Sequence, residues 1–98
     1  MLRRRQGSVH IEIKMNLYRY RVARAADGRL FAYGYDRATA DVRIIELQSF
    51  DASSVTGFAK DGSEVTLEGA PARDLNAGWF WFRFCADNGL TGCTDVTP

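Results

Sequence analysis

Hydrophobic and polar positions alternate along much of the chain, a period of two that is typical of β-strands with one buried face. The alternation runs on both sides of Asp27-Gly28, a dipeptide that can supply the positive φ angles of a two-residue hairpin turn. With these two residues as the loop, Val22 faces Tyr33, and the apolar side chains of both strands share one face. We therefore predict a β-hairpin over residues 18–35.

A second dipeptide of the same kind, Asp61-Gly62, lies between two shorter alternating segments. A two-residue loop there places Phe58 opposite Val65, which again brings apolar side chains to one face. The pattern predicts a second antiparallel hairpin at this position, and Asn88-Gly89 marks a third tight turn.

The phase of the alternation changes once, at Leu17-Tyr18. Apolar residues before this point occupy odd positions, and those after it occupy even positions. A β-bulge, a sharp bend or a boundary between two separate strands would each produce such a change.

Residues 36–50, with the sequence DRATADVRIIELQSF, fit two interpretations. As a helix over about 37–48, the segment has one broad apolar stripe, and Asp36 is a suitable N-cap. As a strand, it has apolar residues on both faces, and its β-branched residues favour this state. We predict the helix.

The segment 78–85, GWFWFRFC, is rich in aromatic residues, and strand periodicity over 79–86 divides them between two faces. The wholly apolar face, which we expect to pack into the core, consists of Phe80, Phe82, Phe84 and Ala86. The mixed face consists of Trp79, Trp81, Arg83 and Cys85, and its Trp and Arg are residue types enriched at binding hot spots. A short return strand over 90–96 is predicted to follow.

Together these elements predict an α+β domain, in which a single antiparallel sheet built from hairpins carries one helix, over about 37–48, packed on it. If that helix is a strand, the alternative is a small all-β barrel. At 98 residues and 11.0 kDa, the chain has the size of one domain. We expect residues 15–98 to form that single globular domain, and residues 1–14 to form an N-terminal arm or a first strand.

The net charge of +1 is unevenly distributed along the chain. Residues 1–29 carry eight basic and two acidic side chains, whereas residues 30–98 carry five basic and ten acidic ones. Mutual neutralisation in the fold is one interpretation, and an anionic partner for the basic third is the other. Because there is neither a long apolar run nor an apolar secretory segment, we expect a cytoplasmic protein without a membrane span.

Recognisable motifs for catalysis or cofactor binding are lacking in the sequence. The single histidine, His10, has no nucleophile elbow or ligand cluster around it, and Cys85 with Cys93 does not make a zinc pattern. We therefore expect no enzyme activity, no catalytic residues, no metal and no cofactor. The two cysteines are expected to be reduced, although a three-residue hairpin loop would place them opposite each other.

These observations favour a small non-catalytic protein-interaction module that uses an aromatic and arginine-bearing sheet face. Its partner is expected to be another protein or a second copy of the chain in a homodimer, bound through Trp79, Trp81 and Arg83. The alternative is a binder of nucleic acid or another anionic ligand that uses the basic N-terminal third, with Arg19 and Arg21 as contacts.

Overall fold

Six strands and one α-helix are formed by residues 14–72 and 76–98, the part of the chain that the computed structural model describes. In chain order they are β2 (Lys14–Arg24), β3 (Leu30–Asp36), β4 (Val42–Asp51), β5 (Thr56–Ala59), β6 (Glu64–Glu68), α1 (Asn76–Asn88) and β7 (Thr94–Asp95). Of the predicted N-terminal arm, Lys14 is the first residue of β2, and the remainder lies outside the described residues.

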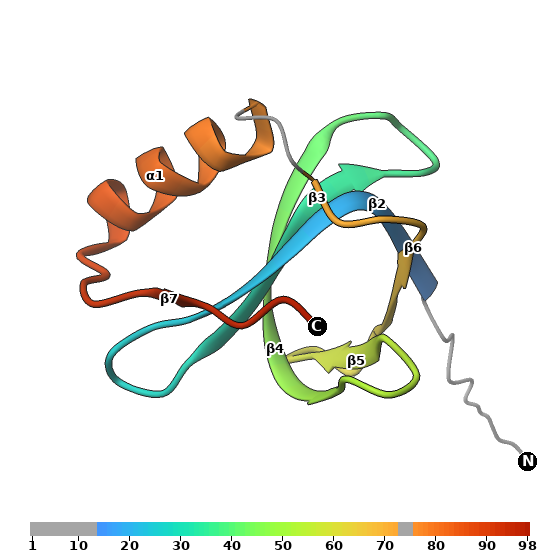
Figure 1. Cartoon of the computed structure of the whole chain (residues 1–98), viewed down its shortest axis with the longest axis horizontal. Helices are drawn as coiled ribbons and strands as arrows, with labels where there is room; N and C mark the ends of the chain where they lie inside the picture. Colours follow the sequence, from blue (N-terminus) through green and yellow to red (C-terminus); the bar gives the residue numbers. More distant parts are fainter. Residues whose placement is uncertain (1–13, 73–75) are drawn as a thin grey trace, which may run out of the picture.

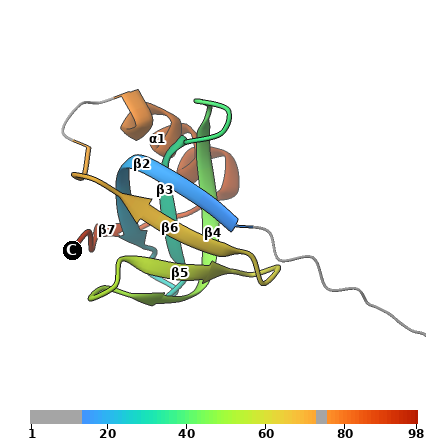
Figure 2. The ribbon, with the colours of Figure 1, turned by 90° about the vertical axis from the view of Figure 1, so that its right-hand side faces the viewer.

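Five of the strands, β2 to β6, close into a barrel (Figures 1 and 2). Consecutive strands are antiparallel, and the closure between β2 and β6 is parallel. At this closure Leu17 lies beside Leu67, and both side chains are buried inside the barrel. The alternative of a small barrel therefore describes the sheet better than the predicted single open antiparallel sheet, and one short helix accompanies it.

The helix predicted over about 37–48 is wrong, because β4 occupies most of that segment after a short turn. Asp36 caps this turn instead of a helix. Its carboxylate accepts a hydrogen bond from the backbone N–H of Ala38 at 2.8 Å, and its C=O accepts one from the N–H of Ala40 at 2.7 Å. An Asx-type turn and a helix N-cap use the same side-chain chemistry, so the residue type alone could not separate them.

Apolar side chains cover both faces of β4, which explains why its sequence resembles a helical stripe. Ile45 and Leu47 pack inside the barrel, whereas Ile44 packs against α1 on the outside. A strand that is buried on both faces loses the alternation of period two and reads as a continuous apolar run.

The strand predicted over 79–86 is also wrong, because this segment belongs to α1. The side chains of α1 that pack against the sheet are spaced three and four residues apart, as a helix requires: Trp81, Phe84 and Cys85. Of the three predicted core residues only Phe84 is in the core, while Phe80 and Phe82 are exposed.

The dipeptide Asn88-Gly89 ends α1 and is not a hairpin turn. Gly89 has a φ of 65°, and the N–H of Leu90 donates a hydrogen bond to the C=O of Cys85 at 2.9 Å. This bond, together with the burial of Leu90 beside Cys85, is the Schellman motif that commonly terminates helices. The predicted return strand over 90–96 is reduced to β7, which pairs with β2.

Both predicted hairpins are present, but each has a register that differs by one residue from the prediction. Val22 pairs with Ala32 rather than with Tyr33, and Val65 pairs with Gly57 rather than with Phe58. A shift of one residue turns every side chain of a strand to the opposite face. Tyr33 therefore points outward to α1 instead of into the barrel beside Val22.

The cause of both register shifts is a loop of three residues instead of two. The N–H of Ala25 donates to the C=O of Arg29 at 2.8 Å, and the N–H of Ala59 donates to the C=O of Ser63 at 2.8 Å. The last loop residue is a glycine in each case, with a φ of 94° at Gly28. This is the common three-residue hairpin, in which a type I turn is followed by a left-handed residue.

The change of phase at Leu17-Tyr18 is a β-bulge within the single strand β2. The register against β3 shifts between Tyr18 and Arg21, and Arg19 has a φ of 49°. Gly34 lies opposite the bulge, where a Cβ atom would approach the C=O oxygen of Tyr18 to 2.9 Å. The bulge therefore requires a residue without a side chain on the facing strand.

Two hydrophobic clusters lie on the two sides of the wall formed by β2, β3 and β4. The cluster inside the barrel comprises Leu17, Tyr20, Val22, Ala32, Leu47, Ala59, Val65 and Leu67. The cluster outside it comprises Ala23, Ala25, Phe31, Tyr33, Trp81 and Leu90. As Figure 1 shows, α1 covers the outside of this wall, and β5 lies on the opposite side of the molecule.

Candidate functional site

The outward surface of α1 carries three large aromatic side chains within four consecutive residues. Trp79 is 57% exposed, Phe80 is 48% exposed and Phe82 is 71% exposed. The ring of Trp79 packs edge to face against that of Phe80, at a centroid distance of 5.5 Å. We refer to Trp79, Phe80 and Phe82 as the aromatic ridge.

Of the predicted binding residues on this segment, the structure brings Trp79 and Arg83 together and separates Trp81 from them. The guanidinium of Arg83 lies 5.8 Å from the ring centroid of Trp79, one helical turn away. Trp81 is 6% exposed and stacks on Tyr33 with a centroid distance of 5.0 Å. Trp81 is therefore a core residue and not part of the surface.

Phe80 and Phe82 are surface residues, although the alternation of the segment predicted that they would lie in the core. The signal that could have found them is the spacing of Trp81, Phe84 and Cys85, which matches one face of a helix. An unbroken aromatic run satisfies periods of 2 and 3.6 equally well, so the glycine after Asn88 was the better indicator of a helix.

A groove of about 360 Å³ separates the Phe80 side of α1 from β4. Its lining is mostly apolar, with one acidic and one basic side chain: Val42, Ile44, Phe80, Arg83, Phe84 and Asp87. The guanidinium of Arg83 and the carboxylate of Asp87 are 3.9 Å apart, and both side chains are two-thirds exposed. The groove is thus apolar at its floor and carries both signs of charge at its rim.

Among the residues that the structure describes, one backbone edge of β4 has no strand partner beside this groove, and we call it the open edge of β4. Within the described part of the chain, pairing between β4 and β5 begins at Leu47, so the preceding residues have a strand partner only in β3. On the side of β4 that faces β5, the C=O of Glu46 accepts a hydrogen bond from the backbone N–H of Lys60. Because backbone groups two residues apart point the same way, the N–H and C=O of Ile44 also point outward on this side.

On the far side of α1, a cavity of about 390 Å³ contains the two cysteines. Both are free thiols, and their sulfur atoms are 3.9 Å apart. The pKa of Cys85 is raised to about 11, mainly by burial and secondly by the hydrogen bond with Cys93. At neutral pH Cys85 is therefore a protonated thiol and a poor nucleophile.

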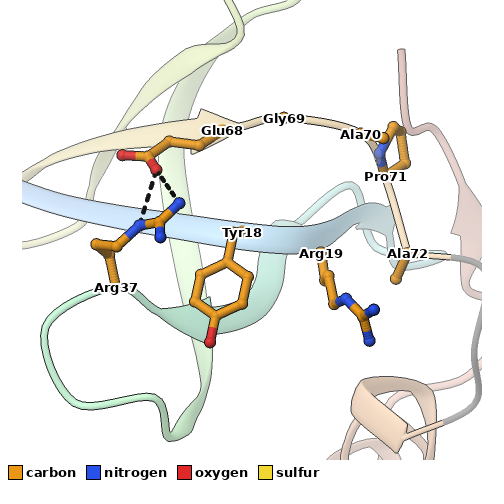
Figure 3. Close-up of a pocket in the computed structure, with 8 residues that line it drawn as sticks. All are labelled: Tyr18, Arg19, Arg37, Glu68, Gly69, Ala70, Pro71 and Ala72. Carbon is orange, nitrogen blue, oxygen red and sulfur yellow. Dashed lines mark hydrogen bonds and ion pairs between the residues drawn. The ribbon is translucent and has the colours of Figure 1, made fainter.

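Arg19 and Arg21, the other predicted binding residues, lie in separate environments, with Arg19 within the bulge and Arg21 at its end. Arg21 forms an ion pair with Asp95 of β7, with a nitrogen to oxygen distance of 2.6 Å. Arg19 lines a groove of about 640 Å³ together with Tyr18, Arg37, Glu68 and residues 69–72 (Figure 3).

The groove beside Tyr18 contains a stack of cationic and aromatic groups. The guanidinium of Arg37 lies 4.8 Å from the ring centroid of Tyr18, and it donates two hydrogen bonds to Glu68, at 2.9 and 3.1 Å. In Figure 3 the Tyr18 ring lies between Arg37 and Arg19. Among the described residues, two guanidinium groups and one carboxylate line this groove: those of Arg19, Arg37 and Glu68.

The uneven distribution of charge along the sequence is partly neutralised in the fold. Lys14 pairs with Glu64 at 3.8 Å, and Arg21 pairs with Asp95, so that basic groups of the first third meet acidic groups of the remainder. Arg29 pairs locally with Asp27 at 2.9 Å. The pairs of Lys14 with Glu64 and of Arg21 with Asp95 therefore join the basic first third to the acidic remainder within the described residues, and mutual neutralisation accounts for part of the asymmetry.

Among residues 14–72 and 76–98, no group of three or more His, Cys, Asp or Glu side chains could hold a metal ion. No helix in this part of the chain is long and apolar enough to cross a membrane. No protein-family model, curated protein or solved structure matches the chain.

Proposed function

We propose that the protein is a small non-catalytic protein-interaction module that binds through the outer surface of α1. The observation that carries this proposal is the aromatic ridge, whose three large side chains are each about half exposed or more. The same helix buries Trp81 and Phe84 in the core, so the exposure of the ridge does not reflect a loosely packed helix.

Burial of the aromatic ridge by a partner would supply a substantial binding free energy. A Phe or Trp side chain can bury about 150–250 Å², and aromatic residues dominate the energetic centres of protein interfaces. Arg83, stacked on Trp79, adds a residue type that is also enriched at such centres. The proposed contacts are therefore Trp79, Phe80, Phe82 and Arg83, in place of the predicted set that included Trp81.

The test compares exposed aromatic side chains on opposite sides of the molecule, two on α1 and one on β5. The protein is used to capture partners from its native host, the captured protein is purified, and its affinity is measured by calorimetry. We expect the double substitution Trp79→Ala, Phe82→Ala to weaken binding at least about tenfold, since hot-spot truncations cost about 2 kcal/mol or more.

The matched control is Phe58→Ala, because Phe58 is 49% exposed and lies on β5, away from α1. This variant is expected to bind as tightly as the wild type. Equal affinities for the wild type and the Trp79→Ala, Phe82→Ala variant would refute the assignment of α1 as the interaction surface.

The groove beside Tyr18 supports a second candidate function, the binding of nucleic acid or another anionic ligand. Its support is that Arg19 and Arg37 line the same groove beside an aromatic ring, and guanidinium groups can contact phosphate. Arg21, the other predicted contact, is paired with Asp95 and does not line this groove.

A single-stranded oligonucleotide provides the probe for this second function. Binding, followed by fluorescence anisotropy, should weaken steeply between about 50 and 200 mM salt, because phosphate contacts release counterions. Arg37→Ala should weaken binding, and Arg21→Ala should not. Failure to bind at the lowest salt concentration would eliminate this candidate.

A further inference from the structure

The geometry points to a second copy of this chain as a partner of the α1 surface, bound across the open edge of β4 in a symmetric dimer. This inference rests on the proposed interaction function and assigns a partner to one part of it, the groove between α1 and β4. The contacts would be backbone pairing of β4 with its copy and side-chain contact of α1 with its copy.

The open edge of β4 is suited to antiparallel pairing with itself. Ile44 has outward-pointing backbone groups, and so it can exchange both hydrogen bonds with Ile44 of a second copy across a two-fold axis. In that register Val42 lies opposite Glu46 of the second copy, and Arg43 lies opposite Ile45. No like charges face each other, so this pairing has no electrostatic penalty between opposed residues.

The length of the edge available for pairing is limited by the chain itself. The C=O of Glu46 is already bonded to the N–H of Lys60, at 3.3 Å, and β5 occupies the edge from Leu47 onward. The short stretch Val42–Glu46 therefore forms the whole strand contact, and side chains of α1 must provide the rest of the interface.

A two-fold axis at Ile44 also places the two α1 helices side by side. The axis of an antiparallel pair is perpendicular to the sheet, so both helices lie on the same face of the joined sheet. Because α1 lies over β3 and β4, the two helix axes would be about 10–14 Å apart, given strand spacings of about 4.8 Å. Phe80 and Phe84 fill that space from both sides.

The charges on the β4 side of α1 in one copy would be complementary to those on the same side of α1 in the second copy. Arg83 and Asp87 line the β4 side of α1, and Phe84 between them lines the groove with Ile44. Two antiparallel copies related by an axis near Ile44 would bring Arg83 of each copy to Asp87 of the other. In a symmetric dimer the same patch of both copies is in contact, so a patch that carries one positive and one negative side chain can form two ion pairs across the two-fold axis.

The first experiment measures the molar mass of the full chain by light scattering after size exclusion, over a range of concentrations. We expect the molar mass of the wild type to shift toward twice 11.0 kDa as concentration rises. Arg83→Asp and Asp87→Arg should each weaken dimerisation about tenfold or more, because like charges then face each other twice. Both side chains are exposed, so neither substitution threatens the fold.

The second experiment mixes the two charge variants. Arg83→Asp presents only acidic groups and Asp87→Arg only basic ones, so an equimolar mixture should form a heterodimer. The double variant Arg83→Asp, Asp87→Arg should recover the homodimer. The control Lys14→Asp makes the same change of charge beside β6 and should leave dimerisation unchanged.

Hydrogen exchange tests the strand contact directly. The amide of Ile44 should become protected as the concentration of wild type rises, and it should stay unprotected in Arg83→Asp. A wild type that remains monomeric at all concentrations would overturn the inference. So would a dimer whose dissociation constant is the same in the wild type, Arg83→Asp and Asp87→Arg. If such a monomer still binds a purified partner through Trp79 and Phe82, only the dimer fails and the proposed function stands.

Discussion

At the scale of single residues, Trp79 and Trp81 show how strongly neighbouring positions can differ in role. Trp81 is stacked on Tyr33 and tilted against Phe31, at centroid distances of 5.0 and 5.4 Å, whereas Trp79 is mostly exposed. Residues two positions apart on a helix point about 200° apart, so one faces the sheet and the other faces away.

Trp81→Ala is expected to reduce the free energy of unfolding by about 3–5 kcal/mol, because it leaves a cavity in the outer cluster. Trp79→Ala should change it by less than about 1 kcal/mol, since the side chain is mostly solvated. Urea unfolding followed by circular dichroism measures both variants. Similar losses for the two substitutions would contradict the placement of Trp81.

Asp51 provides a prediction about protonation. Hydrogen bonds from the hydroxyl and N–H of Ser53 hold the pKa of Asp51 below its ordinary value of 3.8. A lowered pKa in the folded state favours folding above that ordinary value, and the contribution is lost as the pH falls through the folded pKa.

Ser53→Ala should therefore raise the pKa of Asp51 toward 3.8, because the hydroxyl donor at 2.7 Å is removed. An NMR titration of the carboxyl carbons measures the shift. Asp61, whose lowered pKa depends mainly on the backbone N–H of Ser63, is the internal control and should not change. An unchanged pKa at Asp51 would show that the hydroxyl does not hold the carboxylate.

At the scale of elements, the two hairpins show what an Asp-Gly signal establishes and what it leaves open. The signal located both turns, and antiparallel pairing was confirmed on either side of each. It did not separate a two-residue loop from a three-residue loop, because glycine supplies a positive φ in both. The choice determines the register, and hence which of Phe31 and Ala32 enters the barrel.

Two glycines are expected to respond oppositely to the same substitution. Gly34→Ala should destabilise the protein, since its Cβ would lie 2.9 Å from the oxygen of Tyr18 and 3.0 Å from the Cα of Tyr20, both backbone atoms. Gly78→Ala should stabilise it by about 0.5–1 kcal/mol, because Gly78 is in α1 and a Cβ there meets nothing within 4 Å.

Thermal unfolding of both variants measures this contrast, with the wild type as the reference. A higher melting temperature for Gly34→Ala would show that β2 tolerates a side chain opposite its bulge. A lower one for Gly78→Ala would show that the helix is not continuous at that position.

At the scale of the whole molecule, β3 belongs to both hydrophobic clusters. Ala32 points into the barrel, and Phe31 and Tyr33 point out to α1. Neither cluster can lose its packing without disturbing a strand that the other requires, so the barrel and the helix should unfold together.

The prediction at this scale is a single unfolding transition. In a Trp79→Phe background, the fluorescence of Trp81 reports on the packing of α1, and far-UV circular dichroism reports mainly on the barrel. The two probes should give the same midpoint in urea within experimental error. An earlier fluorescence transition would mean that α1 detaches from an intact barrel.

The sequence by itself determined the features that depend on neighbouring residues. The turns at Asp27-Gly28 and Asp61-Gly62 and the two hairpins follow from local alternation and from backbone angles that few residues adopt. The alternation also located the irregularity at Leu17-Tyr18, but only the structure showed that it is a bulge and not a bend or a strand boundary. The binding roles assigned to Trp79, Arg83, Arg19 and Arg21 stay predictions, and the structure changed their surroundings.

Only the tertiary structure decided which segment is a strand and which is a helix, with Val42–Asp51 as β4 and Asn76–Asn88 as α1. Periodicity reports how many faces of a segment are buried, and that number depends on what packs against it. β4 lies between the barrel interior and α1, so it carries apolar side chains on both faces and its sequence lacks the period of two. In α1 the aromatic run hid the helical period, and contact with Phe31 and Tyr33 determined which ring is buried.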